Sequence, residues 1–240
     1  MQRSLLVSYQ KKPTEYFPLI SVIVPVFNGE RYLAEALRSI ENQTYPHIEI
    51  IAVNDGSVDK TMSVIKSFPS VISLSQPHSG LSAALNNGIR KAKGRFFAFL
   101  DADDIWEKEK LSNQMKIFME DPGIEAVFGH IVPFSRSKEI KDAEEGNPIR
   151  KMPGYCKGSM LIKKKSFFRI GFFDTRWEIG DFIDWYKRAK EKDLKTALIP
   201  EVVMKRRIHS RNMSSSRERG KKDYVRILKA AIDRSRNKRD

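Results

Sequence analysis

The stretch LISVIVPV, residues Leu19–Val26, is a nearly continuous run of apolar and β-branched residues. Such a run is typical of a parallel strand that is covered on both faces of its sheet. Similar runs follow at Ile48–Val53, Val71–Leu74 and Arg95–Leu100, and between them apolar residues recur at helical spacing. The predicted helices between these runs cover Glu30–Glu41, Asp59–Ser67 and Ser79–Lys93, with Ser79 or Ser82 as the expected N-cap of the last. This alternation predicts an α/β fold with a mostly parallel central sheet flanked by helices.

The second half of the chain has a weaker pattern. It contains a long polar segment, Ser135–Pro153, which is long enough to serve a function or to move. A basic helix or frayed tail is expected over Ser214–Arg236. The other predicted strands are Ala126–Val132, Ser159–Ile162, Lys195–Ile199 and Val202–Ile208, and the other predicted helices are Lys108–Glu120, Lys163–Ile170 and Asp181–Lys190.

The composition is that of a soluble globular protein. The chain has 240 residues, of which 40% are apolar and 31% charged. No apolar run reaches the roughly 20 residues that span a bilayer. The start of the chain offers too short an apolar stretch for a secretory signal. Cys156 is the single cysteine of the sequence, which suits a reducing compartment. We therefore expect a cytoplasmic protein.

The positive charge is concentrated at the C-terminal end. The whole chain carries a net charge of +14, and Lys205–Asp240 holds 14 Lys or Arg against 4 Asp or Glu. Such a segment attracts anionic lipid headgroups, nucleic acid or an anionic acceptor, and the first would place the protein at the inner face of the membrane. A solvated basic helix explains the pattern equally well. Since the segment lacks interleaved aromatics apart from Tyr224 and carries no nucleic-acid motif, nucleic acid is the weakest of these partners.

Four polar segments lie where the predicted strands end. They are Pro25–Gly29, Asn54–Ser57, Gln76–Gly80 and Asp101–Asp104. Ligands of open α/β sheets bind at the carboxyl ends of the strands. We therefore expect all four segments to converge on one crevice.

The segment Asp101-Ala102-Asp103-Asp104 is the sharpest chemical feature. Carboxylates this close raise one another's pKa unless a cation is present. A hard divalent ion such as Mg²⁺ or Mn²⁺ takes oxygen ligands and shares them with substrate phosphates. The alternative is structural, with Asp103 or Asp104 capping a helix that begins near Trp106. In the second segment, Asp55 is placed to accept a hydrogen bond from a base N–H or a ribose hydroxyl, although Asn54–Ser57 also has the composition of a plain turn.

Four motifs occur in order and together resemble the donor-binding half of the family 2 glycosyltransferases. They are ISVIVPVFNG at 20–29, VNDGS at 53–57, GLSAALNNGI at 80–89 and FLDADD at 99–104. The match is close over residues 18–120, and a weaker echo continues through 171–174, 184–188 and 207–209. The resemblance implies the GT-A fold, with a Rossmann-like nucleotide-binding half and an acceptor half. It also implies inverting transfer of a sugar from a nucleotide diphosphate, most often UDP, to a hydroxyl acceptor on a glycan, a lipid-linked carrier or a peptide. A role in cell-surface polysaccharide or glycoconjugate synthesis goes with it.

The resemblance also implies roles for individual residues. Asp55 would bind the base, Asp101 with Ala102 would face the ribose or sugar, and Asp103 would ligate Mn²⁺ or Mg²⁺. His209 would reach the metal or the diphosphate, although a lone histidine is as often a surface or packing residue. The remaining donor-site residues would be Pro25, Phe27, Asn28, Glu30 and Gly80, with Glu30 also acceptable as a first-turn helix residue.

The chain departs from the family pattern at two places. Leu85 stands where many relatives carry an arginine near the donor. The family's late Glu-Asp pair is replaced by Gly180-Asp181, with Asp184 three residues on. Asp181 is our candidate for the general base and Asp184 the second, because residues at i and i+3 can face one side of a helix. Asp181 as a simple N-cap is the alternative.

Other side chains also have the chemistry to contact a sugar or a phosphate. Arg207 or Arg211 could pair with phosphate, and Trp106, Trp177 and Trp185 could offer a sugar platform or pack in the core. A non-catalytic nucleotide-sugar or glycan-binding relative is the runner-up function. A sugar-phosphate nucleotidyltransferase is disfavoured by the loop after the first strand. The domains we expect are a lead-in (1–18), a single glycosyltransferase domain (19–212, with donor half 19–120 and acceptor half 121–212) and a basic tail (213–240).

Overall fold

The computed structural model describes residues 17–135, 150–209 and 217–236. The strands are β1 (Ile20–Val26), β2 (Ile48–Asn54), β3 (Val71–Ser75), β4 (Phe96–Phe99), β5 (Ile105–Trp106), β6 (Ala126–Phe134), β7 (Met152–Pro153), β8 (Leu161–Lys163) and β9 (Thr196–Arg207). The helices are α1 (Leu33–Glu41), α2 (Thr61–Lys66), α3 (Leu81–Lys91), α4 (Lys110–Glu120), the short 3₁₀ helix η1 (Lys157–Ser159), α6 (Lys164–Ile170), α7 (Asp181–Glu191) and α8 (Arg217–Arg236).

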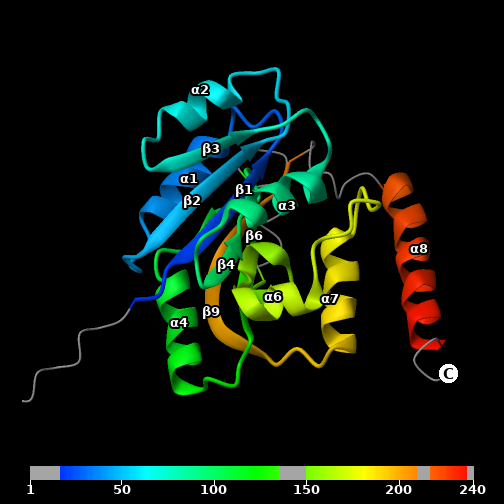
Figure 1. The fold of residues 1–240 in the computed structure, drawn as a ribbon. Coiled ribbons are helices and arrows are strands. Elements are labelled where there is room, and N and C mark those ends of the chain that lie inside the picture. The colour runs from blue at the N-terminus through cyan, green and yellow to red at the C-terminus, as the bar shows by residue number, and fades with distance from the viewer. Residues whose placement is uncertain (1–16, 136–149, 210–216, 237–240) are drawn as a thin grey trace, which may run out of the picture.

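In the described part of the chain, the strands form one sheet in the order β3-β2-β1-β4-β8-β6-β9-β5, with β7 paired to β6. The strands β3, β2, β1 and β4 run parallel, and so do β6 and β9. The strand β8 is antiparallel to both of its neighbours. The expected α/β class with a central sheet flanked by helices is confirmed (Figure 1).

Two apolar layers cover the two faces of the sheet. One contains buried residues of α1 and α4, and the other contains buried residues of α3, α6 and α7. Along β1, Val22 and Val24 belong to the first layer and Ile23 to the second. Because both faces of the strand are buried, its sequence is a continuous apolar run rather than an alternation.

Some elements differ from the sequence-based expectations. The two strands predicted at Lys195–Ile199 and Val202–Ile208 are one strand, β9, whose pairing with β6 shifts register near His130. Pro200 lies inside β9, between the two stretches that pair with β6 in different registers. The N-cap of α3 is Gly80, with no side-chain capping bond, so neither Ser79 nor Ser82 caps it.

The acidic turn does not cap a helix. The next helix, α4, begins at Lys110, and Trp106 lies in β5. The indole Nε1 of Trp106 donates to the Gly158 carbonyl at 2.8 Å. The structural alternative for Asp103 and Asp104 is therefore wrong.

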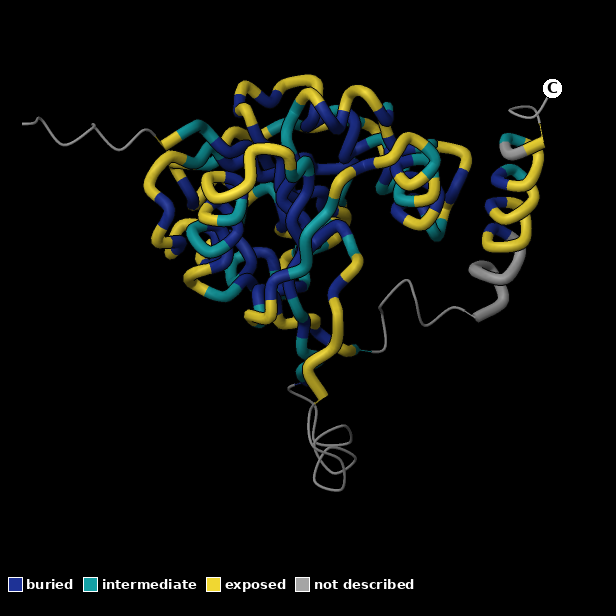
Figure 2. Tube along the Cα trace, turned by 90° about the horizontal axis from the view of Figure 1, so that it is seen from below, coloured by how far each residue is buried: buried dark blue, intermediate teal, exposed yellow. Residues whose placement is uncertain are grey.

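The basic C-terminal helix is present as α8, which lies beside α7 (Figure 1). Figure 2 shows exposed residues along its outer side. Most of the long polar segment and Arg211 lie outside the described residues. Within the described residues, no helix has the length and apolar character needed to cross a membrane.

Lys110 is buried in the layer between α4 and the sheet. Its Nζ donates to Gln114 Oε1 at 2.6 Å and lies 4.4 Å from the centre of the Trp106 ring. Burial lowers the pKa of Lys110 to about 7, against a smaller opposing effect of Cys156. Between this value and the ordinary pKa of 10.5, the unfolded chain binds the proton that the folded chain has lost. Lys110 therefore makes the free energy of unfolding rise with pH across that window.

Candidate active site

The loops after β1 and β2 are fastened to each other. Asn28 adopts a left-handed backbone conformation (φ 51°), donates its N–H to Ser57 Oγ and accepts from the Val58 N–H, each at 2.9 Å. Glu30 accepts from the Lys60 N–H at 2.9 Å. Asn28 and Glu30, both expected at the donor site, thus join the loop after β1 to the loop after β2.

Asp55 is a buried anchor for the loop that follows β3. Its carboxylate accepts from Gln76 Nε2 at 2.7 Å and from the N–H groups of Ser79 and Gly80 at 2.9 Å. It also lies 2.8 Å from His78 Nδ1. Gly80 has φ 90°, which glycine adopts readily. The two loops therefore meet at Asp55.

An exposed aromatic pair adjoins the carboxylate of Asp55. The rings of Phe27 and His78 are stacked with centroids 4.0 Å apart, and Phe27 is half exposed. Pro25, which was also expected to line the nucleoside pocket, is buried inside β1 opposite Val53. Of these two residues, Phe27 is the one available to a flat ligand.

The acidic turn lies beside the loop after β1. A Cβ placed on Gly29 would lie 3.7 Å from the Cβ of Ala102, so the loop after β1 adjoins the turn after β4. All four predicted strand-end segments thus converge. Desolvation raises the pKa of the buried Asp104 and of the partly exposed Asp101, and the carboxylate of Asp103 raises both further. The turn concentrates negative charge that a cation would stabilise.

Residues at and just after the end of β9 contact the acidic turn Asp101–Asp104. The carboxylate of Asp103 lies 2.9 Å from His209 Nε2. The buried guanidinium of Arg207 donates to the Asp103 carbonyl at 2.8 Å and to Glu35 Oε2 at 3.0 Å, and its backbone N–H donates to Asp104 Oδ1. Its centre also lies 4.5 Å from the ring centre of Tyr32. These contacts make Arg207 a support of the acidic turn, in place of the phosphate ligand we had considered.

Lys157, which sequence reasoning missed, lies between two carboxylates. One is Asp101, which was expected to face the donor, and the other is Asp181, the candidate general base. Its Nζ lies 3.3 Å from Asp181 Oδ2 and 3.8 Å from Asp101 Oδ1. Burial opposes its charge, but the two carboxylates outweigh burial and raise the pKa of Lys157. A signal was available in the sequence, since this lysine lies three residues before the apolar run Met160–Ile162. A charged residue at such a position needs a partner.

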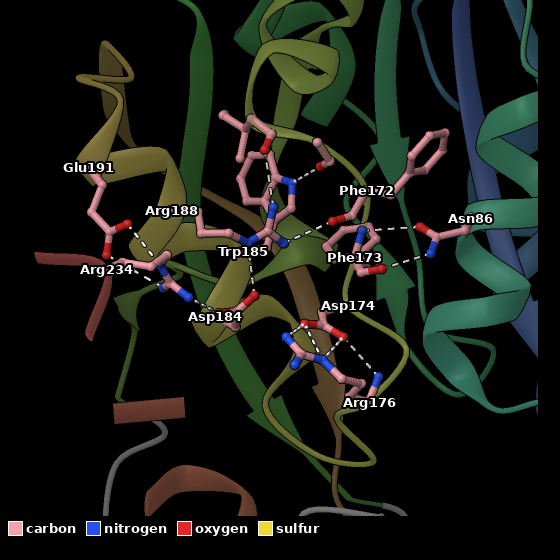
Figure 3. A network of polar contacts seen from close by, with 12 residues as sticks. Asn86, Phe172, Phe173, Asp174, Arg176, Asp184, Trp185, Arg188, Glu191 and Arg234 are labelled. Atoms are coloured by element: carbon pink, nitrogen blue, oxygen red, sulfur yellow. Dashed lines mark hydrogen bonds and ion pairs between the residues drawn. The ribbon is translucent and has the colours of Figure 1, made fainter. Parts of the chain in front are cut away.

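Asp184 does not share the surroundings of Asp181. Its carboxylate contacts Arg188 Nε at 2.9 Å and Arg234 Nη1 at 3.3 Å (Figure 3). The expectation that both carboxylates face one site is therefore not met, because helix neighbours at i and i+3 can still turn to different partners. Asp181 is the first residue of α7, and Gly180 is the N-cap.

The segment before α7 is fixed to the donor half by Asn86. Its Nδ2 donates to the Phe173 carbonyl at 2.8 Å, and its Oδ1 accepts from the Phe173 N–H at 3.1 Å (Figure 3). The adjacent Leu85 is fully buried in the apolar layer. The position where relatives carry an arginine therefore offers no cation to the donor.

The three tryptophans are buried. Trp106, Trp177 and Trp185 all belong to the core. Trp185 stacks on Phe167 and donates its Nε1 to the Gly171 carbonyl at 2.8 Å. The sugar platform we had considered is therefore absent from these residues.

The residues of the turn fit a divalent cation in part. Asp103 and His209 supply oxygen and nitrogen donors side by side. Among the described residues, no three His, Cys, Asp or Glu side chains are arranged to hold a metal ion by themselves. Mg²⁺ keeps few protein ligands and completes its shell with water and substrate phosphates, so this incomplete set suits a substrate-bound ion.

The fold is an α/β fold of the GT-A type. The family model "Glycosyl transferase family 2" matches residues 21–186, and the chain belongs to this family. Glycosyltransferase RP339 of Rickettsia prowazekii, itself uncharacterized, is 32% identical over 83% of this chain and 67% of its own length. The putative teichuronic acid biosynthesis glycosyltransferase TuaG of Bacillus subtilis is 36% identical over 45% of this chain and 44% of its own length.

Two solved structures share the fold. TarS of S. aureus (residues 1–349), crystallised with UDP-GlcNAc, has a TM-score of 0.70 at 18% identity, covering 82% of this chain and 60% of that one. The mannosyltransferase PcManGT of Pyrobaculum calidifontis, in complex with GDP-Man and Mn²⁺, has a TM-score of 0.70 at 24% identity. That match covers 91% of this chain and 65% of PcManGT. Both proteins extend beyond the matched region.

Proposed function

We propose that this chain transfers a sugar, with inversion, from a nucleotide diphosphate to a hydroxyl acceptor in the synthesis of a cell-surface polysaccharide or glycoconjugate. The observation that carries this proposal is the position of Lys157, whose ammonium lies between the carboxylates of Asp101 and Asp181 and so joins the acidic turn to the start of α7. A UDP-sugar is the donor we put first. GDP is the alternative nucleotide, because PcManGT binds GDP-Man.

On the donor side, Phe27 would stack its ring on the nucleobase. The carboxylate of Asp55, where the same loops meet, would accept a hydrogen bond from that nucleobase. A base N–H bound to Asp55 would replace one of its present donors. Asp101 and Ala102 would face the ribose or the sugar. Asp103 and His209 would hold Mn²⁺ or Mg²⁺, which would neutralise the charge on the departing diphosphate.

On the acceptor side, Asp181 is the general base. Its Oδ2 is held by Lys157, and we assign Oδ1 to the acceptor hydroxyl. The hydroxyl oxygen bonds to the anomeric carbon from the face opposite the diphosphate, the bond from that carbon to the diphosphate oxygen breaks, and the hydroxyl proton passes to Asp181. Asp184 has no part in this step, because its carboxylate is held by Arg188 and Arg234.

Incubation with a panel of nucleotide sugars and Mn²⁺ tests the proposal through release of the nucleoside diphosphate. We expect release with one nucleotide class, and loss of release when Mn²⁺ is chelated. Binding of a donor without any release or transfer would instead favour the non-catalytic nucleotide-sugar-binding alternative. An absence of both binding and release would refute the donor assignment. The proposed location is cytoplasmic, with the basic C-terminal segment at an anionic membrane surface.

A further inference from the structure

The helix α8 has an inner side that holds the segment carrying the proposed base. Asp223 Oδ2 accepts from the N–H groups of Glu178 and Ile179 at 3.0 and 3.2 Å, just before α7 begins. The side chain of Ile227 packs against Gly180, where an added Cβ would lie 2.8 Å from its Cδ1.

The other end of α8 is fastened to α7 as well. Arg234 pairs with Asp184 at 3.3 Å and with Glu191 at 3.0 Å (Figure 3). Contacts therefore hold α8 at both ends of α7, and α8 has a fixed orientation relative to Asp181.

The outer side of α8 carries an apolar ridge that the described part of the chain leaves uncovered. Val225 is 68% exposed, Leu228 62%, Ile232 45% and Tyr224 44%. Val225, Leu228 and Ile232 are spaced by three and four and lie on one helix face, so they form a continuous strip, here called the α8 ridge. Tyr224, whose ring also adjoins Gly180, lies at the edge of this strip. Scattered exposed apolar residues need no explanation, but a contiguous strip on one helix indicates an interaction site.

Basic residues flank the α8 ridge. Arg226, Lys229 and Arg236 are exposed on the same helix. The segment Lys205–Asp240 as a whole holds 14 Lys or Arg against 4 Asp or Glu. An apolar strip bordered by Lys and Arg is the pattern of a helix that lies in the plane of an anionic lipid surface.

We propose that the α8 ridge inserts into an anionic membrane surface and that α8 thereby holds the Asp181 segment at that surface. A second copy of the chain is a poorer occupant, because pairing two ridges would bring two strongly positive segments together. The membrane contact itself stands on the ridge and its charges. Only its consequence for catalysis rests on the proposed function.

Co-sedimentation of the full chain with lipid vesicles tests the proposal. Vesicles of phosphatidylcholine alone are compared with an equal mixture of phosphatidylcholine and phosphatidylglycerol, at low and high salt. We expect binding to the mixed vesicles, weakened by salt but not abolished, because the apolar contact is not screened. The double variant Leu228→Glu/Ile232→Glu should bind them at least about 10-fold more weakly.

Met119→Glu is the matched control, since Met119 is 75% exposed on α4, outside the ridge. It should bind vesicles like the wild type. Equal binding by the ridge variant and the wild type would overturn the proposal, and so would absence of binding to mixed vesicles. A wild-type dimer that the ridge variant converts to monomers would assign the ridge to a second copy instead. Nucleoside diphosphate release in solution, measured on the same variants, reports separately on the proposed function.

Discussion

Replacing Lys157 by methionine removes the ammonium group that lies between Asp101 and Asp181. The substitution keeps most of the side-chain volume and leaves two carboxylates facing each other without their shared cation. At an effective dielectric constant of about 20, an ion pair at 3.3 Å, the distance from Lys157 to Asp181, is worth up to about 5 kcal/mol. The pair with Asp101, at 3.8 Å, counts for less because that side chain is 41% exposed and solvent screens it.

The net cost is smaller than these Coulomb energies, since the wild type already bears the desolvation of Lys157. Breaking a buried ion pair costs about 3–5 kcal/mol, and we expect Lys157→Met to lower the free energy of unfolding by about 3 kcal/mol. Asp181 also loses the contact that fixes its position. Displacement of a catalytic group by about 1 Å costs on the order of 100-fold in rate, so we expect at least that loss in kcat.

Urea unfolding and steady-state transfer kinetics measure the two effects. Lys157→Arg keeps the charge and should recover much of both losses. Lys163→Met is the matched control, because Lys163 donates to the Pro122 carbonyl and has no contact with Asp181. An unchanged urea midpoint together with unchanged kcat in Lys157→Met would refute the reasoning.

Three further substitutions test other parts of the structure. Asp181→Asn should keep donor affinity and lower kcat at least about 100-fold; transfer at the wild-type rate would show that the base lies elsewhere. Lys110→Met should raise the free energy of unfolding at pH 7 by about 2–4 kcal/mol and remove its rise toward pH 10, as pH-dependent urea titrations can measure. The same pH slope in variant and wild type would contradict the assignment to Lys110. Asn86→Ala should lower the free energy of unfolding by about 2–4 kcal/mol, because it leaves both polar backbone groups of Phe173 without their partner. The control Asn87→Ala should lower it by about 1 kcal/mol. Equal unfolding midpoints of the two variants would argue against the link between Asn86 and Phe173.

The first half of the fold could be predicted because its strands are buried on both faces. The run at Leu19–Val26 is apolar throughout, and such a run next to helical periodicity leaves few alternatives. β5 and β7 could not be predicted, because two-residue strands have no periodicity. Their existence depends on tertiary pairing with β9 and β6.

The residues of the candidate site could be predicted where they directly follow a predicted strand, and not elsewhere. Asp55 and the Asp101–Asp103 turn follow apolar runs directly, so the topology brings them together. Lys157 follows a long polar segment, and its contact with Asp181 is set by tertiary folding. The separation of Asp181 from Asp184 likewise depends on α8, which supplies Arg234. The domain boundaries expected from the sequence stay a prediction.

Binding of the nucleotide donor tests the central claim most directly. Isothermal titration of the wild type with UDP- and GDP-sugars, with Mn²⁺ and then with a chelator, measures whether a metal links the donor to the acidic turn. We predict binding of one nucleotide class with Mn²⁺, and at least about 10-fold weaker binding with the chelator or in Asp103→Asn. Binding that is the same with and without Mn²⁺, and the same in Asp103→Asn, would contradict the assignment of Asp101–Asp103 as the metal and diphosphate site.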